Sequence, residues 1–356
     1  MSVTISDVII SAIIGAIVAI LTMFVKDLII KLWFDNRKLK KDELAIFRQY
    51  ADPLSNATMS FLWRLNEILE QKHKSSYLHV NYTTTYAIYK RDSTVYRMAS
   101  LLGWLRAFQK ELTLLKTKNN DELQKIKNSI NEFNKALADG THIESERLNG
   151  FLELWCFNFK DCFFSSLLAS SIDNEIKDFI TKKGCDNALE LEEIERFQLI
   201  KCITTEMAES YKVNNVSDDI IKQTTAQAIQ LCSLKEAWIY RDWQDAIGDM
   251  MLRENKNEVR KYDVIGFYEF SNKHKSTEDV DREWIVRMEN VFYDLDVTGA
   301  NKADMRLEQL KHIVRATSEL MLSLIENDKQ RKILMSKTIE LANRLKKQLC
   351  LTSSLQ

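Results

Sequence analysis

The 356-residue chain contains one proline and only eight glycines. Average usage is ~5% for proline and ~7% for glycine, so both turn-forming residues are strongly depleted. Sheet-rich folds need turn residues about every 8–12 positions, and their scarcity favours long helices joined by short loops. We therefore expect an all-α fold.

The sequence also lacks the motifs by which many catalytic sites are recognised. It has no glycine-rich phosphate loop, no G-x-S-x-G and no H-E-x-x-H. Its five histidines are scattered, and its six cysteines include no C-x-x-C pair, which predicts reduced, mostly buried thiols. We expect no enzyme, no cofactor and no metal site. A cleft that gathers His142 or His312 with carboxylates would instead favour an enzyme.

One acidic loop imitates a calcium site. Asp294, Asp296, Thr298 and Gly299 match the first half of an EF-hand loop. The bidentate acid needed at the twelfth position would fall on Met305, so the calcium cage cannot close.

Net charge gives no sign of a polyanionic partner. The chain carries 50 Lys and Arg against 51 Asp and Glu, a net charge of −1. A nucleic-acid partner is not expected from this balance.

Against this background, residues 8–25 stand out: VIISAIIGAIVAILTMFV has no charged side chain. An eighteen-residue helix is roughly 27 Å long, close to the ~30 Å hydrocarbon core of a bilayer. The stretch is apolar on all faces, unlike a surface helix, and it has no basic segment before it, unlike a cleaved signal peptide. We predict a single-pass transmembrane helix within an anchor of residues 1–42, followed by a cytoplasmic helical bundle of residues 43–356.

Basic residues follow this stretch and none precede it. The positive-inside rule therefore places the N-terminus outside the bacterial inner membrane and the body in the cytoplasm. The same side chains can contact anionic lipid headgroups. This basic collar consists of Lys26, Lys31, Arg37, Lys38, Lys40 and Lys41.

Small residues recur within the apolar run. Ser11, Gly15 and Ala19 are spaced by four, a pattern that lets transmembrane helices approach closely. The stripe predicts self-association through this helix, although such helices also tolerate small residues without pairing.

Three features of the body carry further expectations. Pro53 suits the first turn of a new helix, with Asp52 as its N-cap. Residues 72–94 break the helical pattern and predict an irregular segment, either a functional loop or a packed excursion, in which 79–88 can form a short extended piece. Residues 148–172 are strongly apolar, but charges interrupt them, which favours a central buried helix over a second span.

The chain resembles a bacterial family of membrane-anchored, all-helical proteins to which no activity is assigned. The resemblance covers most of residues 45–325 and implies a single helical body, with Trp63 departing from the family pattern. It is carried by YADPLSNATMSFLWRLNEIL (50–69), STVYRMASLLGWLRAFQKEL (93–112), AIGDMML (246–252) and MRLEQLKHIVRATSEL (305–320).

Two functions remain in view. The first is a membrane-anchored interaction or sensor protein without a catalytic site, which binds a cytoplasmic protein or a small ligand between its helices. The alternative is an oligomerising effector that perturbs or permeabilises the membrane in a bacterial antiviral or toxin-like defence system.

Overall fold

The computed structural model describes most of the chain. Within the described ranges, the side chains of residues 5–21 and of some further residues are outside the description. The backbone is described for residues 5–70, 72–113, 121–138, 141–157, 162–185, 187–255, 260–276, 280–300, 303–326, 333 and 335–353.

The protein is built from helices, which confirms the all-α prediction. The first half contains α1 (Ile5–Glu70), η1 (Lys72–Leu78), α2 (Thr85–Thr113), α3 (Asp121–Ala138), α4 (Thr141–Leu154) and α5 (Cys162–Lys182). The second half contains η2 (Ala188–Glu190), α6 (Glu193–Tyr211), α7 (Asp218–Cys232), α8 (Arg241–Met250), β1 (Leu252–Glu254), β2 (Tyr262–Val264), α9 (Phe267–Lys275), α10 (Arg282–Phe292), α11 (Arg306–Ile325) and α13 (Ser336–Ser353).

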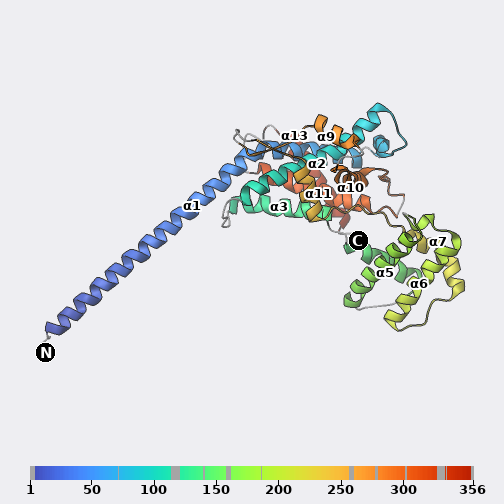
Figure 1. Ribbon diagram of the computed structural model, residues 1–356, viewed down its shortest axis with the longest axis horizontal. Coiled ribbons are helices and arrows are strands. Elements are labelled where there is room, and N and C mark those ends of the chain that lie inside the picture. Colours follow the sequence, from blue (N-terminus) through green and yellow to red (C-terminus); the bar gives the residue numbers. More distant parts are fainter. Residues whose placement is uncertain are drawn as a thin grey trace.

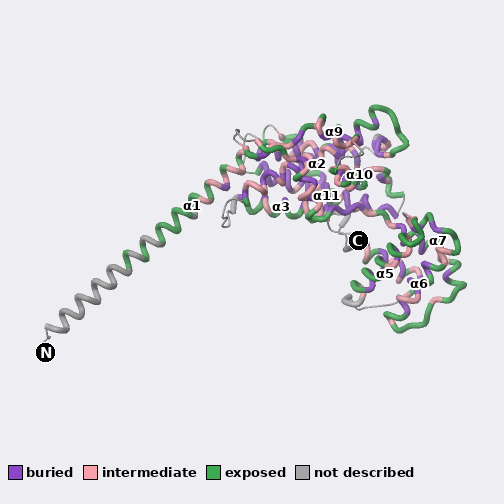
Figure 2. The backbone as a smooth tube through the Cα atoms, viewed as in Figure 1, coloured by how far each residue is buried: buried purple, intermediate pink, exposed green. Residues whose placement is uncertain are grey.

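Helix α1 dominates the shape of the molecule. Its N-terminal part projects from the body, and its C-terminal part lies inside it (Figure 1). Figure 2 shows the same division. The described residues of the projecting part are largely exposed, and buried residues, drawn in purple, begin where α1 enters the body. Tyr50, Leu54, Phe61 and Leu65 of this helix are fully buried.

The prediction that Pro53 begins a new helix is wrong, because Pro53 lies inside α1. A proline within a helix removes the hydrogen bond to the carbonyl four residues earlier, here that of Gln49. The side chain of Arg260 compensates, since its Nη1 donates to the Gln49 carbonyl at 3.5 Å. The helix therefore continues through a position that would otherwise leave a carbonyl unpaired.

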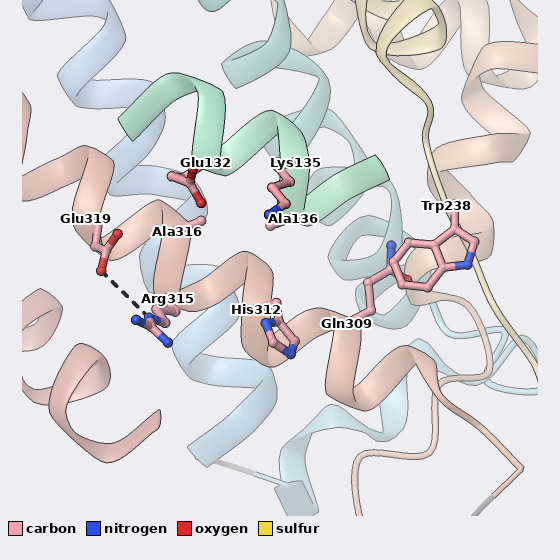
Figure 3. Close-up of a pocket in the computed structure, with 9 residues that line it drawn as sticks. All are labelled: Glu132, Lys135, Ala136, Trp238, Gln309, His312, Arg315, Ala316 and Glu319. Atoms are coloured by element: carbon pink, nitrogen blue, oxygen red, sulfur yellow. Dashed lines mark ion pairs between the residues drawn. The ribbon is translucent and has the colours of Figure 1, made fainter. Parts of the chain in front are cut away.

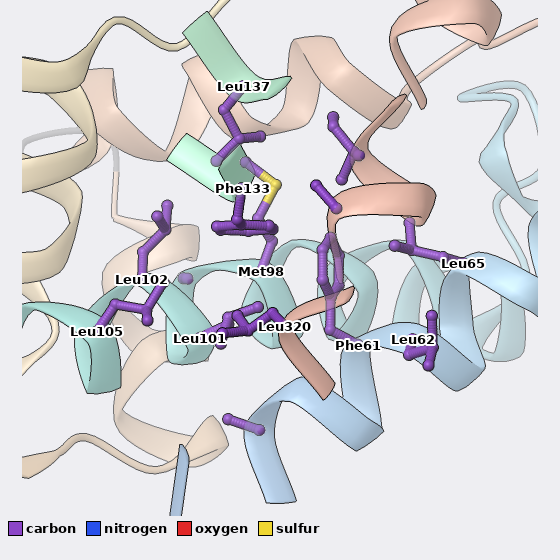
Figure 4. Packing of buried hydrophobic residues seen from close by; sticks show 14 of the residues in the cluster. Phe61, Leu62, Leu65, Met98, Leu101, Leu102, Leu105, Phe133, Leu137 and Leu320 are labelled. Atoms are coloured by element: carbon purple, nitrogen blue, oxygen red, sulfur yellow. The ribbon is translucent and has the colours of Figure 1, made fainter. Parts of the chain in front are cut away.

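The main hydrophobic core surrounds the buried part of α1. Phe61 of α1 packs edge-on against Phe133 of α3 and Phe292 of α10, with ring centroids 6.5 and 6.4 Å apart. Figure 4 shows Phe61 among Met98 and Leu101 of α2, Phe133 of α3 and Leu320 of α11. This core is shared by α1, α2, α3, α8, α10, α11 and α13.

Helices α4 to α7 enclose a second, separate hydrophobic cluster. They form the lobe in green and yellow in Figure 1. The chain leaves the main body after α3 and returns at the same place, because the Ile239 amide donates to the Leu137 carbonyl at 2.8 Å. Residues 141–232 are thus an inserted helical lobe.

The apolar stretch 148–172 is not one central helix, contrary to expectation. It is divided between α4 and α5 of the inserted lobe, and Cys156 between them has a left-handed φ of 55°. The cysteines are also less buried than expected. Cys156 and Cys202 are exposed, whereas Cys232 is buried, and all three are free thiols.

The predicted extended piece over 79–88 is wrong as well, because α2 already begins at Thr85. The hydroxyl of Thr84 accepts a hydrogen bond from the Ala87 amide and caps the new helix. Before this cap, the Arg91 guanidinium donates to the carbonyls of Tyr77, His79 and Tyr82 and fixes the turn. A short antiparallel pair, β1 with β2, is a further feature that the helical pattern did not predict.

Candidate functional site

The basic collar lies on the projecting part of α1. All six of its side chains are exposed, as expected for groups that face water or lipid headgroups. The guanidinium of Arg37 lies over the ring of Trp33, 5.1 Å from its centroid. These six residues are Lys26, Lys31, Arg37, Lys38, Lys40 and Lys41.

The predicted packing stripe of Ser11, Gly15 and Ala19 falls on residues whose side chains lie outside the description. Within the part of the chain that is described, no helix has the length and apolarity to cross a membrane. The transmembrane assignment of residues 8–25 therefore remains a prediction.

A groove of about 510 Å³ lies between α3 and α11 in the main body. Residues 309, 312, 315, 316 and 319 contribute to it because a spacing of three or four places them on one face of α11. The full lining is Glu132, Lys135, Ala136, Trp238, Gln309, His312, Arg315, Ala316 and Glu319 (Figure 3).

One end of the groove is aromatic and contains an unsatisfied amide. The Nε2 of Gln309 donates to the Ala237 carbonyl at 2.9 Å, which places its side chain beside Trp238. Only 1% of Gln309 is exposed, and its buried Oε1 has no hydrogen-bond partner among the described residues. An unpaired buried acceptor costs about 1–3 kcal/mol.

The other end of the groove is charged. Arg315 lies 3.7 Å from Glu319 through its Nε, and Lys346 of α13 contacts the same carboxylate at 3.4 Å. Figure 3 shows Arg315 and Glu319 at the end away from Trp238, with His312 between. Glu319 also lines a neighbouring hollow of about 510 Å³ between α3, α11 and α13, so the two hollows meet at this residue.

A second polar cluster is packed inside the body rather than in a groove. His274 of α9 donates through Nε2 to Glu289 of α10 at 2.6 Å, and Arg282 donates to the same carboxylate at 3.0 Å. Burial alone would raise the pKa of Glu289, but these two hydrogen bonds outweigh it and the pKa lies below its ordinary value. Asp92 of α2, 3.9 Å from His274 Nδ1, instead has its pKa raised by burial. The cluster joins α2, α9 and α10.

We expect Glu289→Gln to weaken the fold by about 1.5 kcal/mol at pH 7, the scale of a hydrogen bond to a charged group. Because the folded pKa of Glu289 is lowered, its ionised form contributes stability above the unfolded value of about 4.3, and this is lost as pH falls through the folded pKa. Urea unfolding between pH 7 and pH 3 should show a steeper decline for the wild type than for Glu289→Gln, with most of the difference below about pH 4.5. Equal declines would contradict the assignment, and Glu283→Gln, at an exposed position of α10, is the control.

The sequence did not predict this groove. It named His312 only as a residue whose meeting with carboxylates in a cleft would favour an enzyme, and the structure places it in a groove with Glu132 and Glu319. The side chain of His142 lies outside the description. Gln309 and Trp238 were missed, because an amide on a helix and a tryptophan after an inserted lobe carry no local signal of a site.

The acidic loop that imitates an EF-hand has a structural role. Asp296 accepts hydrogen bonds from the amide and hydroxyl of Thr298, which forms a local turn. The Asp304 carboxylate is held by the Arg306 guanidinium at 2.7 Å through both of its oxygens. These contacts give Asp296 and Asp304 a structural role in the loop.

Comparison with known proteins adds no relative: no family model, no curated protein and no solved structure matches the chain. The family resemblance carried by the four sequence blocks therefore stays a prediction. The blocks that contain Gly103 and Gly248 nevertheless contact each other, since α2 and α8 pack closely at these glycines.

Proposed function

We propose that the protein is a membrane-anchored helical sensor or interaction protein of the bacterial inner membrane. In this proposal residues 8–25 cross the bilayer with the N-terminus outside, and the basic collar lies at the cytoplasmic surface. The body is cytoplasmic and receives a small ligand or a protein partner in the groove between α3 and α11. Catalysis is not required for this role.

The observation that carries the proposal is the continuity of α1. One helix contains the apolar run, the exposed collar and buried core residues such as Phe61 and Leu65. About 1.5 Å per residue gives the segment from residue 26 to residue 42 a length of roughly 25 Å, so it can hold the body clear of the membrane surface. The helix therefore fixes the distance and orientation of the body relative to the apolar segment, which a flexible loop would not do.

The groove is connected to α1 through direct helix packing. Helix α11 forms one wall of the groove and also packs directly on α1 and α13. Leu320 and Leu324 of α11 are buried in the core that contains Phe61 of α1. Because packed cores shift between discrete arrangements rather than deform continuously, occupancy of the groove can be transmitted through α11 to α1.

Membrane fractionation tests the anchor. We expect the full-length protein to stay with membranes after a carbonate wash, because the apolar helix is inserted rather than adsorbed. Arginine at both Ile14 and Val18 should move it to the soluble fraction, since each central arginine costs about 2.5–3.5 kcal/mol of insertion. Protease added to intact spheroplasts should leave the body uncut, and inverted vesicles should expose it.

A full-length protein that is released by carbonate would contradict the proposal. Circular dichroism of the Ile14→Arg, Val18→Arg variant provides the control for folding, because both positions lie outside the packed body. Arginine at Ile29 and Leu32, beyond the predicted span, should leave fractionation unchanged.

An oligomerising membrane effector is the second candidate, and a specific feature of α1 favours it. Ile29, Leu32, Trp33 and Phe34 are 59%, 49%, 55% and 59% exposed on the projecting helix. Apolar side chains on a bare helix favour contact with lipid or with another copy, and the stripe of Ser11, Gly15 and Ala19 would continue such a contact in the bilayer. Membrane potential separates the candidates: expression of a sensor leaves it unchanged, whereas clustering of an effector collapses it.

A further inference from the structure

The buried part of α1 and its projecting part share one face of the helix. Inside the body this face is covered, because Tyr50 packs beside Trp104 of α2 and Glu43 pairs with Lys127 of α3 at 3.4 Å. Steps of three or four residues keep to one face of a helix. Traced back from Glu43 in such steps, the same face carries apolar residues in the projecting part: Val25, Ile29, Leu32 and Leu39.

Outside the body, this apolar face is uncovered. Val25, Ile29 and Leu32 are 55%, 59% and 49% exposed, and Leu39, the nearest to the body, is half-buried. Figure 1 shows none of the other described helices beside the projecting part of α1. Burial of such a face against a matching surface is favourable, because it removes apolar area from water.

The spacing of these residues is that of a coiled coil. Val25, Leu32 and Leu39 are seven residues apart, which makes them d positions of a heptad, and Ile29 is then an a position. The sequence has an asparagine at the next a position, residue 36. A single asparagine at an a position sets the register of parallel two-stranded coiled coils. The pattern therefore indicates two strands rather than a larger bundle.

The charges beside the apolar face select the partner and its direction. With Ile29 at a, Asp35 is a g position and Lys40 is the e position that follows it. In a parallel pair of identical helices, Asp35 of each copy faces Lys40 of the other, so two opposite-charge pairs form. In an antiparallel pair, g faces g and e faces e, which would bring like charges together. The complementary surface is thus a second copy of this chain in parallel.

The remaining cations of the collar do not oppose such a pairing. A turn of about 100° per residue places Arg37, Lys38 and Lys41 on the side of α1 away from the apolar face. Ile30 and Phe34 also lie on this outer side, close to the predicted span, where lipid can cover them. Two copies can therefore meet without bringing these three cations into the contact.

We propose that residues 25–39 of α1 form a parallel two-stranded coiled coil with the same residues of a second copy. The segment is about 21 Å long, and it is already helical as part of α1, so pairing does not require the backbone to be ordered. The inference deepens the proposed function and rests on it in one respect: two spans inserted in the same direction hold the segments parallel. The pairing places two bodies at the same height above the bilayer.

Sedimentation equilibrium of the full-length protein in density-matched detergent tests the pairing. We expect the wild type to be a dimer, and Leu32→Glu to raise its dissociation constant at least about tenfold, because each copy loses a d residue and gains a charge in the contact. Phe34→Glu is the matched control on the outer side of the helix, and it should change the dissociation constant less than about twofold.

An exchange of charges tests the parallel register. Asp35→Lys and Lys40→Asp should each raise the dissociation constant about fivefold at low ionic strength, because two opposite-charge pairs become like-charge pairs. The variant that carries both changes should return to within about twofold of the wild type. Asp35 and Lys40 are five residues apart, a spacing at which side chains of one helix are not neighbours, so a recovery reports contact between copies.

The inference is overturned if the full-length protein sediments as a monomer, if Leu32→Glu and Phe34→Glu act alike, or if the double exchange does not restore the dimer. Equal effects of the two glutamates would mean that detergent or lipid, rather than a second copy, covers the apolar face. A dimer that follows the expected pattern yet is released from membranes by carbonate loses only the proposed anchor. A monomer that stays with membranes loses only the coiled coil.

Discussion

Arg306→Met should destabilise the protein by about 3–5 kcal/mol, the cost of removing one partner from a buried charge pair. The Arg306 side chain makes five hydrogen bonds: two to the Asp304 carboxylate and three to the carbonyls of Asn290, Tyr293 and Asp294. Its removal leaves the three carbonyls without these donors and the buried Asp304 carboxylate without its cation, held only by the backbone amides of Asp296 and residue 306. For a body of this size we expect the thermal midpoint to fall by roughly 5–8 °C.

A double variant shows whether the unpaired carboxylate causes the loss. Asp304→Asn in the Arg306→Met background should recover at least about 1 kcal/mol, because a neutral amide is cheaper to bury than an unpaired charge. Lys311→Met, at a half-buried position of the same helix whose side chain pairs with Glu308, should stay within about 0.5 kcal/mol of the wild type. An Arg306→Met variant as stable as Lys311→Met would contradict the role of this residue.

Gly248→Ala should destabilise the body by about 2 kcal/mol, although the same change in an exposed helix stabilises by up to ~1 kcal/mol. A Cβ atom at Gly248 would lie 2.6 Å from Arg106 Cβ and 3.2 Å from the Leu102 carbonyl oxygen. Both neighbours belong to the rigid part of α2, so the two helices would have to move apart. The movement would also disturb the ion pairs of Arg106 with Asp245 and Asp249.

Chemical unfolding of matched glycine variants checks this crossing of α2 and α8. Gly103→Ala should behave like Gly248→Ala, because its Cβ would lie 2.8 Å from Met251 Cβ. Gly266→Ala is the control, since nothing lies within 4 Å of a Cβ built there. Stabilisation by Gly248→Ala would show that propensity outweighs packing and would contradict the close contact.

Composition predicted the fold class but not where the helices begin and end. The scarcity of proline and glycine correctly indicated an all-α fold. Pro53 was misread because its local preference is for a helix start, while the structure retains the helix with a hydrogen bond from Arg260. Arg260 and the Gln49 carbonyl that it pairs are 211 positions apart, so a local sequence pattern carries no sign of this contact.

The groove was harder still to predict. Gln309, His312, Arg315 and Glu319 read in sequence as the polar face of an amphipathic helix, which usually means solvent. They become a groove because α3 lies against α11 and because Trp238 is brought there after the inserted lobe. The return of the chain at Ile239 to the carbonyl of Leu137 is a long-range closure that periodicity cannot reveal.

The uninterrupted course of α1 fixes an angle as well as a distance. A helix turns by about 100° and rises ~1.5 Å with each residue. No loop separates residues 26–41 from the buried part of α1. The number of residues in this segment therefore sets the rotation of the body about the helix axis relative to the N-terminal part of α1. One residue added there turns the α3–α11 groove by about 100° around the helix axis, whereas seven added residues return it to within ~20° of its original direction. The number of residues in this segment of α1 therefore determines the direction in which the groove faces.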